Sequence, residues 1–499
     1  MRQRWAFCLV FLGGLFLACP FPRLGYAEAM PATSGKESAA KGKLPVTTSS
    51  RAARQHFEKA MENLEYVRRD DALGELRKAV AADPNFTQAL ILISHLSPDP
   101  EEQHRMRVRA QESIAHVSAG EKLMVRWLAG VQEERYVPAI AAMNDLLAKY
   151  PQDQRLAFLA GRWLLFQERY DQAMVVLERA ITLAPNYPAA LNELAYAYAY
   201  DGNFEKAFPL MEKYVALEPD QPNPHDSYGE LLRLDGKFDA ALEQYRASIR
   251  IDPDFGSELG VADTYALMGK EEDAREEYER AIVFATSESD KVAYELQSAV
   301  TWIREGNHKQ AEKALHEVGR HAHNSGLGTL EAECYRVWAL YEPDYKQAVK
   351  HFKAAEDSLN EGHAMSRSDR DEEQARILLA EAIRSSEARD SNLASASVKK
   401  LETMAAASHS QVVQRSYHGA EGALLVAQAK YADAIPHLEE DLSDPLSMRL
   451  LWKSYDETGA ASQAATLATK ISLLEVPTAE QALVVPQFRA SLVSQAMRP

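Results

Sequence analysis

The chain of 499 residues carries 73 Asp and Glu side chains against 56 Lys and Arg, a formal net charge of −17 at pH 7. Nucleic acids and anionic membranes are bound mainly through basic surfaces. The acidic balance therefore argues against nucleic acid or anionic lipid as the main partner and indicates a soluble protein with some preference for cationic partners.

The first 27 residues have the pattern of an export signal. Arg2 and Arg4 precede an uncharged run from Trp5 to Ala18, and small residues flank Tyr26 at the end of the segment. A charged start, a short apolar core and a small-residue end are typical of a secretory signal peptide. The run is also too short to span a bilayer comfortably. We expect residues 1–27 to be cleaved after Ala27 and the protein to be periplasmic or secreted.

A lipid anchor is the alternative for this segment. Leu17-Ala18-Cys19 resembles a lipoprotein cleavage site with Cys19 as the acylated residue. The leucine stands one place too close to the cysteine, and Pro20 follows, so cleavage after Ala27 remains the preferred interpretation. No other stretch is apolar enough to cross a membrane.

The mature chain would keep a single cysteine, Cys334, and so could form no internal disulfide. We expect a buried helical residue there, with a reactive thiol as the alternative. Removing residues 1–27 also removes three arginines, which takes the formal charge from −17 to −20. Residues 28–50 are rich in Ala, Ser, Thr, Gly, Lys and Pro without periodicity, and are predicted to form a flexible linker.

Several residue types then recur at a fixed interval of 34 residues. Proline ends each period because it cannot continue a helix, and glycine accepts the left-handed conformation where a first helix ends. Alanine early in the second helix lets two helix backbones approach closely. The recurring residues are Pro151, Pro185, Pro219 and Pro253; Tyr170, Phe204 and Phe238; Ala173, Ala207 and Ala241; and Gly202 with Gly236.

A Gly-aromatic-x-x-Ala turn followed by a proline twelve residues after the alanine resembles the tetratricopeptide repeat, a helix–turn–helix unit. The resemblance covers roughly residues 52–475. It implies an all-α, right-handed solenoid, in which stacked units bury together the apolar faces that one unit cannot bury alone. Strand signals are missing.

The repeats divide into two predicted arrays and an end segment. Residues 51–286 form an N-terminal array with the best repeats at 120–286, and residues 287–475 form a degenerate C-terminal array. Residues 476–499 are expected to cap the end of the stack, because terminal repeats meet water on one face.

A search for catalytic chemistry finds little. The sequence has no Gly-rich phosphate loop, no Gly-x-Ser-x-Gly elbow and no Cys-x-x-Cys pair. His316-Glu317 and His321 resemble a zinc-protease helix, but histidines five apart do not share a helix face. His321 and His323 could hold a metal loosely, although surface histidines explain them equally well. We expect no enzymatic activity, no cofactor and no metal.

The resemblance implies that the first helix of each unit lines a concave face. The family's groove commonly binds extended peptides through asparagine and basic residues. Basic residues lead along the three best units and acidic residues follow, which predicts a peptide whose acidic end lies near Arg162 and whose basic end lies near Glu230. The alternative is that these residues form a solvated helical face with no specific partner. The candidate peptide-binding residues are Arg155, Phe158, Arg162, Asn192, Tyr196, Asn223, Asp226, Glu230 and Arg233.

The function expected from the sequence is an exported scaffold for protein–protein interactions. The alternative is a periplasmic, enzyme-associated or ligand-carrying component whose groove holds a small molecule or glycan. That alternative needs aromatic side chains gathered in one groove segment, such as Tyr196 with Tyr198 and Tyr200.

Overall fold

The computed structural model describes residues 42–97, 99–133, 135–285, 287–361, 365, 367–408 and 410–496. The predicted signal peptide 1–27, with the possible acylation site Cys19, lies outside the described residues, as does most of the predicted linker. Within the described ranges the structure contains twenty-five α-helices, two short 3-10 helices and no strand. The prediction of an all-α solenoid is confirmed. None of the described helices is long and apolar enough to cross a membrane.

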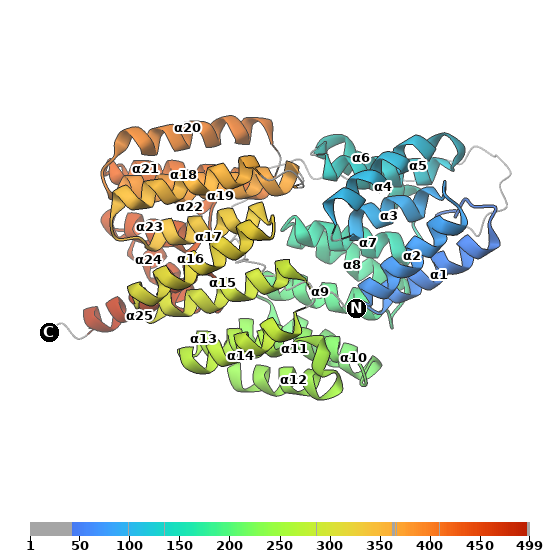
Figure 1. Ribbon diagram of the computed structural model, residues 1–499, viewed down its shortest axis with the longest axis horizontal. Coiled ribbons are helices and arrows are strands. Elements are labelled where there is room, and N and C mark those ends of the chain that lie inside the picture. The colour runs from blue at the N-terminus through green and yellow to red at the C-terminus, as the bar shows by residue number, and fades with distance from the viewer. Residues whose placement is uncertain are drawn as a thin grey trace.

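The first fourteen α-helices form seven antiparallel pairs along the N-terminal half (Figure 1). The pairs are α1 (Arg51–Glu65) with α2 (Arg69–Ala82), α3 (Thr87–Leu96) with α4 (Pro100–Ser113), α5 (Ala119–Gln132) with α6 (Tyr136–Lys149), α7 (Gln154–Phe166) with α8 (Tyr170–Leu183), α9 (Pro188–Tyr200) with α10 (Phe204–Leu217), α11 (Pro222–Leu234) with α12 (Phe238–Ile251), and α13 (Glu258–Leu267) with α14 (Glu271–Phe284). The 3-10 helices η1 (Ile114–His116) and η2 (Pro253–Phe255) lie between pairs.

The C-terminal half continues the pairing, and most of its helices from α15 to α21 are longer than those of the first half. These are α15 (Glu288–Arg304) with α16 (His308–Asn324), α17 (Gly328–Tyr341) with α18 (Tyr345–Glu361), α19 (Arg367–Glu387) with α20 (Ser391–Ala407), α21 (Gln411–Ala427) with α22 (Tyr431–Glu439), α23 (Pro445–Glu457) with α24 (Ala461–Ser472), and a last unpaired helix, α25 (Ala479–Ala496).

The recurring residues have the roles that the period predicts. Gly202 and Gly236 end their first helices with φ of +80° and +72°, in the left-handed region. Glu168 stands 34 residues before Gly202 and adopts the same conformation, with φ of +55°. Ala173 and Ala207 are fully buried where the second helices approach the first.

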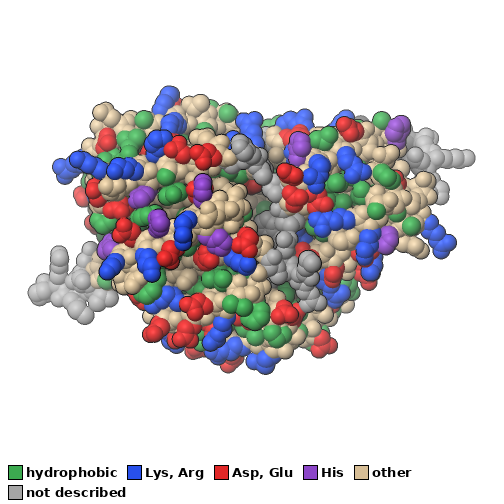
Figure 2. Space-filling view, in the orientation of Figure 1, with side chains coloured by type: hydrophobic (Ala, Val, Ile, Leu, Met, Phe, Trp, Pro, Cys, Tyr) green, Lys and Arg blue, Asp and Glu red, His purple; other side chains and the backbone are tan. Residues whose placement is uncertain are grey.

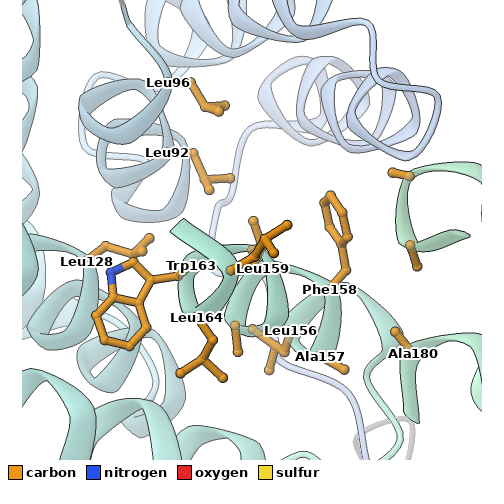
Figure 3. Packing of buried hydrophobic residues seen from close by; sticks show 14 of the residues in the cluster. Leu92, Leu96, Leu128, Leu156, Ala157, Phe158, Leu159, Trp163, Leu164 and Ala180 are labelled. Carbon is orange, nitrogen blue, oxygen red and sulfur yellow. The ribbon is translucent and has the colours of Figure 1, made fainter. Parts of the chain in front are cut away.

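The core of α7 shows how each first helix packs on several sides (Figure 3). Leu159 lies on the side of α7 that faces Leu92 of α3, while Leu156 and Leu164 lie on the opposite side. Trp163 extends toward Leu128 of α5.

The two halves form lobes that are joined by the green helices α10–α14 in Figure 1. Each lobe also touches the other directly, because Arg415 of α21 forms an ion pair with Glu168 at the α7–α8 turn. The Glu168 side chain is 4% exposed. The stack therefore curves back on itself instead of running as an open ribbon.

The end of the predicted linker, residues 42–50, packs against the N-terminal lobe through hydrogen bonds. Residues 42–50 cross the N-terminal lobe in an extended conformation. The Leu44 amide donates to Asp153 Oδ2 at 2.9 Å, and the Thr47 amide donates to Glu121 Oε1 at 2.8 Å. The prediction of a flexible linker is wrong for these residues, because polar side chains at helix starts satisfy their backbone.

The last helix differs from the predicted end cap. α25 contacts α15, α23 and α24, and its Phe488 ring packs edge-on against Trp452 of α23 at 5.1 Å between ring centroids. Because α15 and α23 stand four repeats apart, α25 lies across the C-terminal lobe and not on the end of the stack. Its apolar residues belong to the core of that lobe.

Cys334 of α17 is buried, with 1% of its surface exposed, as the sequence predicts. Burial raises the pKa of its thiol well above the ordinary value. The thiol is therefore protonated and shielded at neutral pH, which favours the structural interpretation over a reactive group.

Candidate functional site

The candidate site is a cavity of about 870 Å³ on the concave side of the N-terminal half. Its walls are the inward faces of the first helices α7, α9, α11 and α13, together with the η2 segment. The α1–α2 turn forms the opposite wall, since residue 64 and residues 66–71 line the same cavity. Curvature of the stack brings the first repeat over the groove of the fourth to seventh repeats.

Eight of the nine sequence-predicted peptide-binding residues line this cavity. They are Phe158, Arg162, Asn192, Tyr196, Asn223, Asp226, Glu230 and Arg233. Residues 34 apart stand side by side on successive first helices. The 34-residue period therefore accounts for the position of these eight residues in the cavity. Whether they bind a peptide stays a prediction.

Arg155 is the exception. Its Nε donates to Glu65 at 2.7 Å and its Nη1 donates to Glu58 at 3.0 Å, both on α1. Those two hydrogen bonds raise the pKa of Arg155 in spite of its burial. Arg155 therefore fastens the first repeat to the fourth and lies outside the cavity lining.

Polar contacts cross from each first helix to the next. They join Arg162 to Glu193 at 3.0 Å, Tyr196 to Glu230 at 2.7 Å and Arg233 to Asp263 at 3.0 Å. Glu193 already forms an ion pair with the Arg162 guanidinium, so an acidic group would have to compete with it; that a peptide's acidic end lies near Arg162 stays a prediction.

Burial sets the electrostatics of these contacts. Loss of water raises the pKa of Glu193, Glu230 and Asp263, while the arginine beside each carboxyl group opposes the rise. Carboxylates in such a setting gain most from a further cation, because each lacks the hydration that it would have on the surface.

Asn192 has an unsatisfied acceptor. Its side chain is 5% exposed and lines the cavity at the middle of α9. The Oδ1 atom has no hydrogen-bond partner among the described residues. Asn223, one repeat further on, instead donates to the hydroxyl of Tyr214 at 2.9 Å. Asn192 is therefore the amide that remains available to a ligand.

Several lining residues carry no period signal in the sequence. Arg68 and Arg69 come from the α1–α2 turn, and His95 ends α3. Burial, with the charges of Arg162 and Arg69 nearby, lowers the pKa of His95 to about 4, so the ring is neutral at pH 7. The sequence could not place these groups, because they reach the cavity through the closure of the stack and not through the repeat.

The histidines of α16 form ion pairs instead of a metal site. His321 contacts Glu295 at 2.8 Å and Glu288 at 3.0 Å, and both raise its pKa, with Glu295 the larger cause. His323 contacts Glu331 at 3.1 Å. In the part of the chain that the structure describes, no group of three or more His, Cys, Asp or Glu side chains could hold a metal ion.

Charge on the outer surface is mixed. On the face drawn in Figure 2, Lys and Arg side chains alternate with Asp and Glu over both lobes.

Comparison with known proteins identifies the repeat. A tetratricopeptide-repeat family model matches residues 164–231, which span the end of α7, all of α8, α9 and α10, and most of α11. No functionally curated protein matches the sequence.

Solved structures match parts of the chain at low identity. A tetratricopeptide repeat protein from Parabacteroides merdae is 14% identical, covers 48% of this chain and 96% of its own, and has a TM-score of 0.35. A thermophilic TPR protein from Thermus thermophilus is 20% identical, with coverage of 43% and 98% and a TM-score of 0.29. MamA from Desulfovibrio magneticus is 18% identical, with coverage of 41% and 98% and a TM-score of 0.24. These scores carry no argument about function.

The family assignment rests on the matched segment, the 34-residue period and the helix pairs that this period produces. Gly202, Gly236 and the buried alanines occupy in the structure the turn and contact positions that the repeat requires. Residues 164–231 therefore match the tetratricopeptide repeat, and the other described helix pairs have the same helix–turn–helix arrangement.

Proposed function

We propose that the protein is a scaffold that binds an extended segment of a partner protein in the cavity between α7, α9, α11 and α13. The observation that carries the proposal is the unpartnered Oδ1 of Asn192. A buried acceptor without a hydrogen bond costs about 1–3 kcal/mol, and a backbone N–H of a bound segment would satisfy it. The function is binding, and no residue is given a catalytic role.

The proposal is tested by replacing Asn192 with alanine. A partner segment is first identified by cross-linking and pull-down, and its affinity is measured by calorimetry. Loss of the amide removes one or two hydrogen bonds to the segment, so affinity should fall by about 1–2 kcal/mol, roughly 5- to 30-fold.

Gln172→Ala is the matched control for this experiment. Gln172 is an exposed amide on α8, outside the cavity lining. Its loss should leave affinity unchanged. If Asn192→Ala and Gln172→Ala bind the segment as tightly as the wild type, the cavity is not the binding site and the proposal is rejected.

A small molecule or glycan is the alternative ligand. Tyr196, Tyr200, Tyr245 and Tyr294 all line the cavity, and aromatic faces stack on sugar rings and other flat ligands. Tyr198 instead donates its hydroxyl to Glu178 and is not among the lining residues. A ligand of this class would be displaced by the partner segment in a competition experiment.

We also infer that the chain is exported, with cleavage after Ala27. The support is the charged start, the short apolar run and the small residues before Glu28. Mass spectrometry of the mature N-terminus should find Glu28 as the first residue. A chain that begins at an acylated Cys19 would contradict the cleavage site, and an intact Met1 would contradict export.

A further inference from the structure

The cavity is balanced in charge at one end and acidic at the other. On the α1–α2 turn, α7 and α9, three arginines and three carboxylates line it. These are Arg68, Arg69, Asp70, Asp71, Arg162 and Glu193. His95 adds no charge at this end at neutral pH, because its pKa is lowered to about 4.

The other end, from the start of α11 through η2 to α13, has six carboxylates and one arginine. The carboxylates are Asp220, Asp226, Glu230, Asp252, Asp254 and Asp263. Arg233 is the single lining cation there, and it is shared: its Nη1 lies 3.0 Å from Asp263 and its Nη2 lies 3.7 Å from Glu230. One guanidinium between two buried carboxylates leaves this end with a negative excess.

At the balanced end, each arginine already contacts a carboxylate or a backbone carbonyl of the protein. Arg162 pairs with Glu193, Arg68 lies 3.5 Å from Glu218, and Arg69 donates through Nε to the carbonyl of Leu96 at 3.0 Å. An anionic group entering here would compete with contacts that already exist. A cationic group entering the acidic end would meet six lining carboxylates and one lining arginine.

A second, independent feature points to a donor-bearing ligand. The unpartnered Oδ1 of Asn192 can only accept a hydrogen bond, and Asn192 stands on α9, one helix before Asp226 of α11. A chain lying past Asn192 toward α11 reaches the acidic end within one repeat. Tyr245 and Tyr294 line the same region, and aromatic faces also favour a cation.

We propose that the acidic end of the cavity binds a lysine or arginine side chain of the partner segment, which makes this a site selective for basic peptides. The inference rests on the proposed function, since it names the chemistry of the segment that the same cavity binds. The backbone of the segment donates to Asn192, and its basic side chain enters between Asp226 and Glu230. Selectivity arises because an acidic side chain at that place would face like charges.

The test uses the mature full-length chain and a random decapeptide library displayed on phage. Peptides that bind the wild type and fail to bind Asn192→Ala are sequenced, and lysine and arginine should be enriched among them while aspartate and glutamate are depleted. Two matched synthetic peptides, one recovered sequence and its Lys/Arg→Gln version, are then compared by calorimetry. The basic peptide should bind about tenfold tighter or more.

The double variant Asp226→Asn/Glu230→Gln tests whether the carboxylates of the acidic end cause the preference for basic peptides. Both replacements keep the shape of the side chain, and they can still accept hydrogen bonds from Ser257 and Tyr196. The double variant should lose the preference for the basic peptide, while Glu243→Gln, an exposed carboxylate on α12, should keep it.

The outcomes separate the two claims. Recovered peptides that need Asn192 but show no basic enrichment, or a preference that survives in the double variant, overturn the cationic selectivity and leave the scaffold proposal standing. A library that yields no peptide dependent on Asn192 overturns both.

Discussion

Replacing Arg336 with methionine should lower the free energy of unfolding of the C-terminal lobe by about 3–5 kcal/mol. Arg336 of α17 is 6% exposed in its side chain and is surrounded by carboxylates. Its Nε donates to Glu373 of α19 at 2.8 Å, and its Nη1 donates to Glu480 of α25. Glu373 and Glu480 are 7% and 12% exposed, so loss of the guanidinium would take the ion-pair partner from Glu480 and leave Glu373 with the more exposed Arg376, 3.4 Å away.

The same contacts explain why α25 lies across the lobe. Arg336 is the point where α17, α19 and α25 meet, and no apolar contact can replace a charge that two buried carboxylates share. We therefore expect α25 to detach first in Arg336→Met. Hydrogen exchange followed by mass spectrometry should show lost protection in residues 479–492, before protection is lost in α9 or α11.

Arg280→Met is the control for this experiment. Arg280 of α14 also contacts two glutamates, Glu276 and Glu277, but its side chain is 57% exposed. Exposed ion pairs contribute little, so its loss should change stability by no more than about 0.5 kcal/mol. Equal stability of the two variants would show that the Arg336 cluster does not hold α25 in place.

The repeats could be predicted because their signals are local. The units predicted to end at Pro185, Pro219 and Pro253 correspond to α7–α8, α9–α10 and α11–α12. Within each unit, the left-handed turn residue (Glu168, Gly202 or Gly236) and the buried alanine act on their immediate neighbours. A local cause leaves a trace at a fixed spacing, and the sequence alone is enough to find it.

Closure of the stack could not be predicted in this way. The contacts of Arg155 with α1, of Arg415 with Glu168 and of α25 with α15 depend on curvature added over many units. No residue spacing in the sequence indicates how much the stack curves over many repeats. Residues 42–50 escaped prediction for a related reason, since their partners Glu121 and Asp153 lie more than 70 positions away.

The candidate site shows the same division. The 34-residue spacing brings Arg162, Tyr196 and Glu230 to one wall of the cavity, as predicted. Their polar partners are residues about one repeat on, such as Glu193 for Arg162, which the alignment of equivalent positions does not reveal. The sequence therefore indicated which residues share one wall of the cavity, and the structure was needed to show which charges pair there.

Packing between the two helices of a unit gives the second large effect. A Cβ added at Gly161 of α7 would lie 2.5 Å from Cγ of Leu177, a fully buried residue of α8. The side chain of Leu177 cannot withdraw into an interior packed this closely. Gly161→Ala should therefore cost about 1–3 kcal/mol of stability, the usual range for overpacking in a core.

Equivalent positions in the next two units show how this contact is tuned. The pair Gly161 and Leu177 becomes Ala195 and Met211, and then Gly229 with Tyr245. A Cβ on Gly229 would lie 3.0 Å from the ring of Tyr245. Alanine stands where the opposing side chain is the unbranched methionine, which adapts its shape, and glycine stands where that side chain is branched or aromatic.

The double variant Gly161→Ala/Leu177→Met copies the pair of the next unit and should recover most of the stability that Gly161→Ala loses. Urea unfolding of the wild type, both single variants and the double variant forms a cycle, in which the two changes should couple favourably by about 1 kcal/mol or more. Gly74→Ala is the control, because a Cβ at Gly74 of α2 meets nothing within 4 Å. It should stabilise the protein by about 0.5–1 kcal/mol, since alanine favours the helix. If Gly161→Ala is as harmless as Gly74→Ala, or Leu177→Met gives no rescue, close helix approach is not what requires glycine at this position.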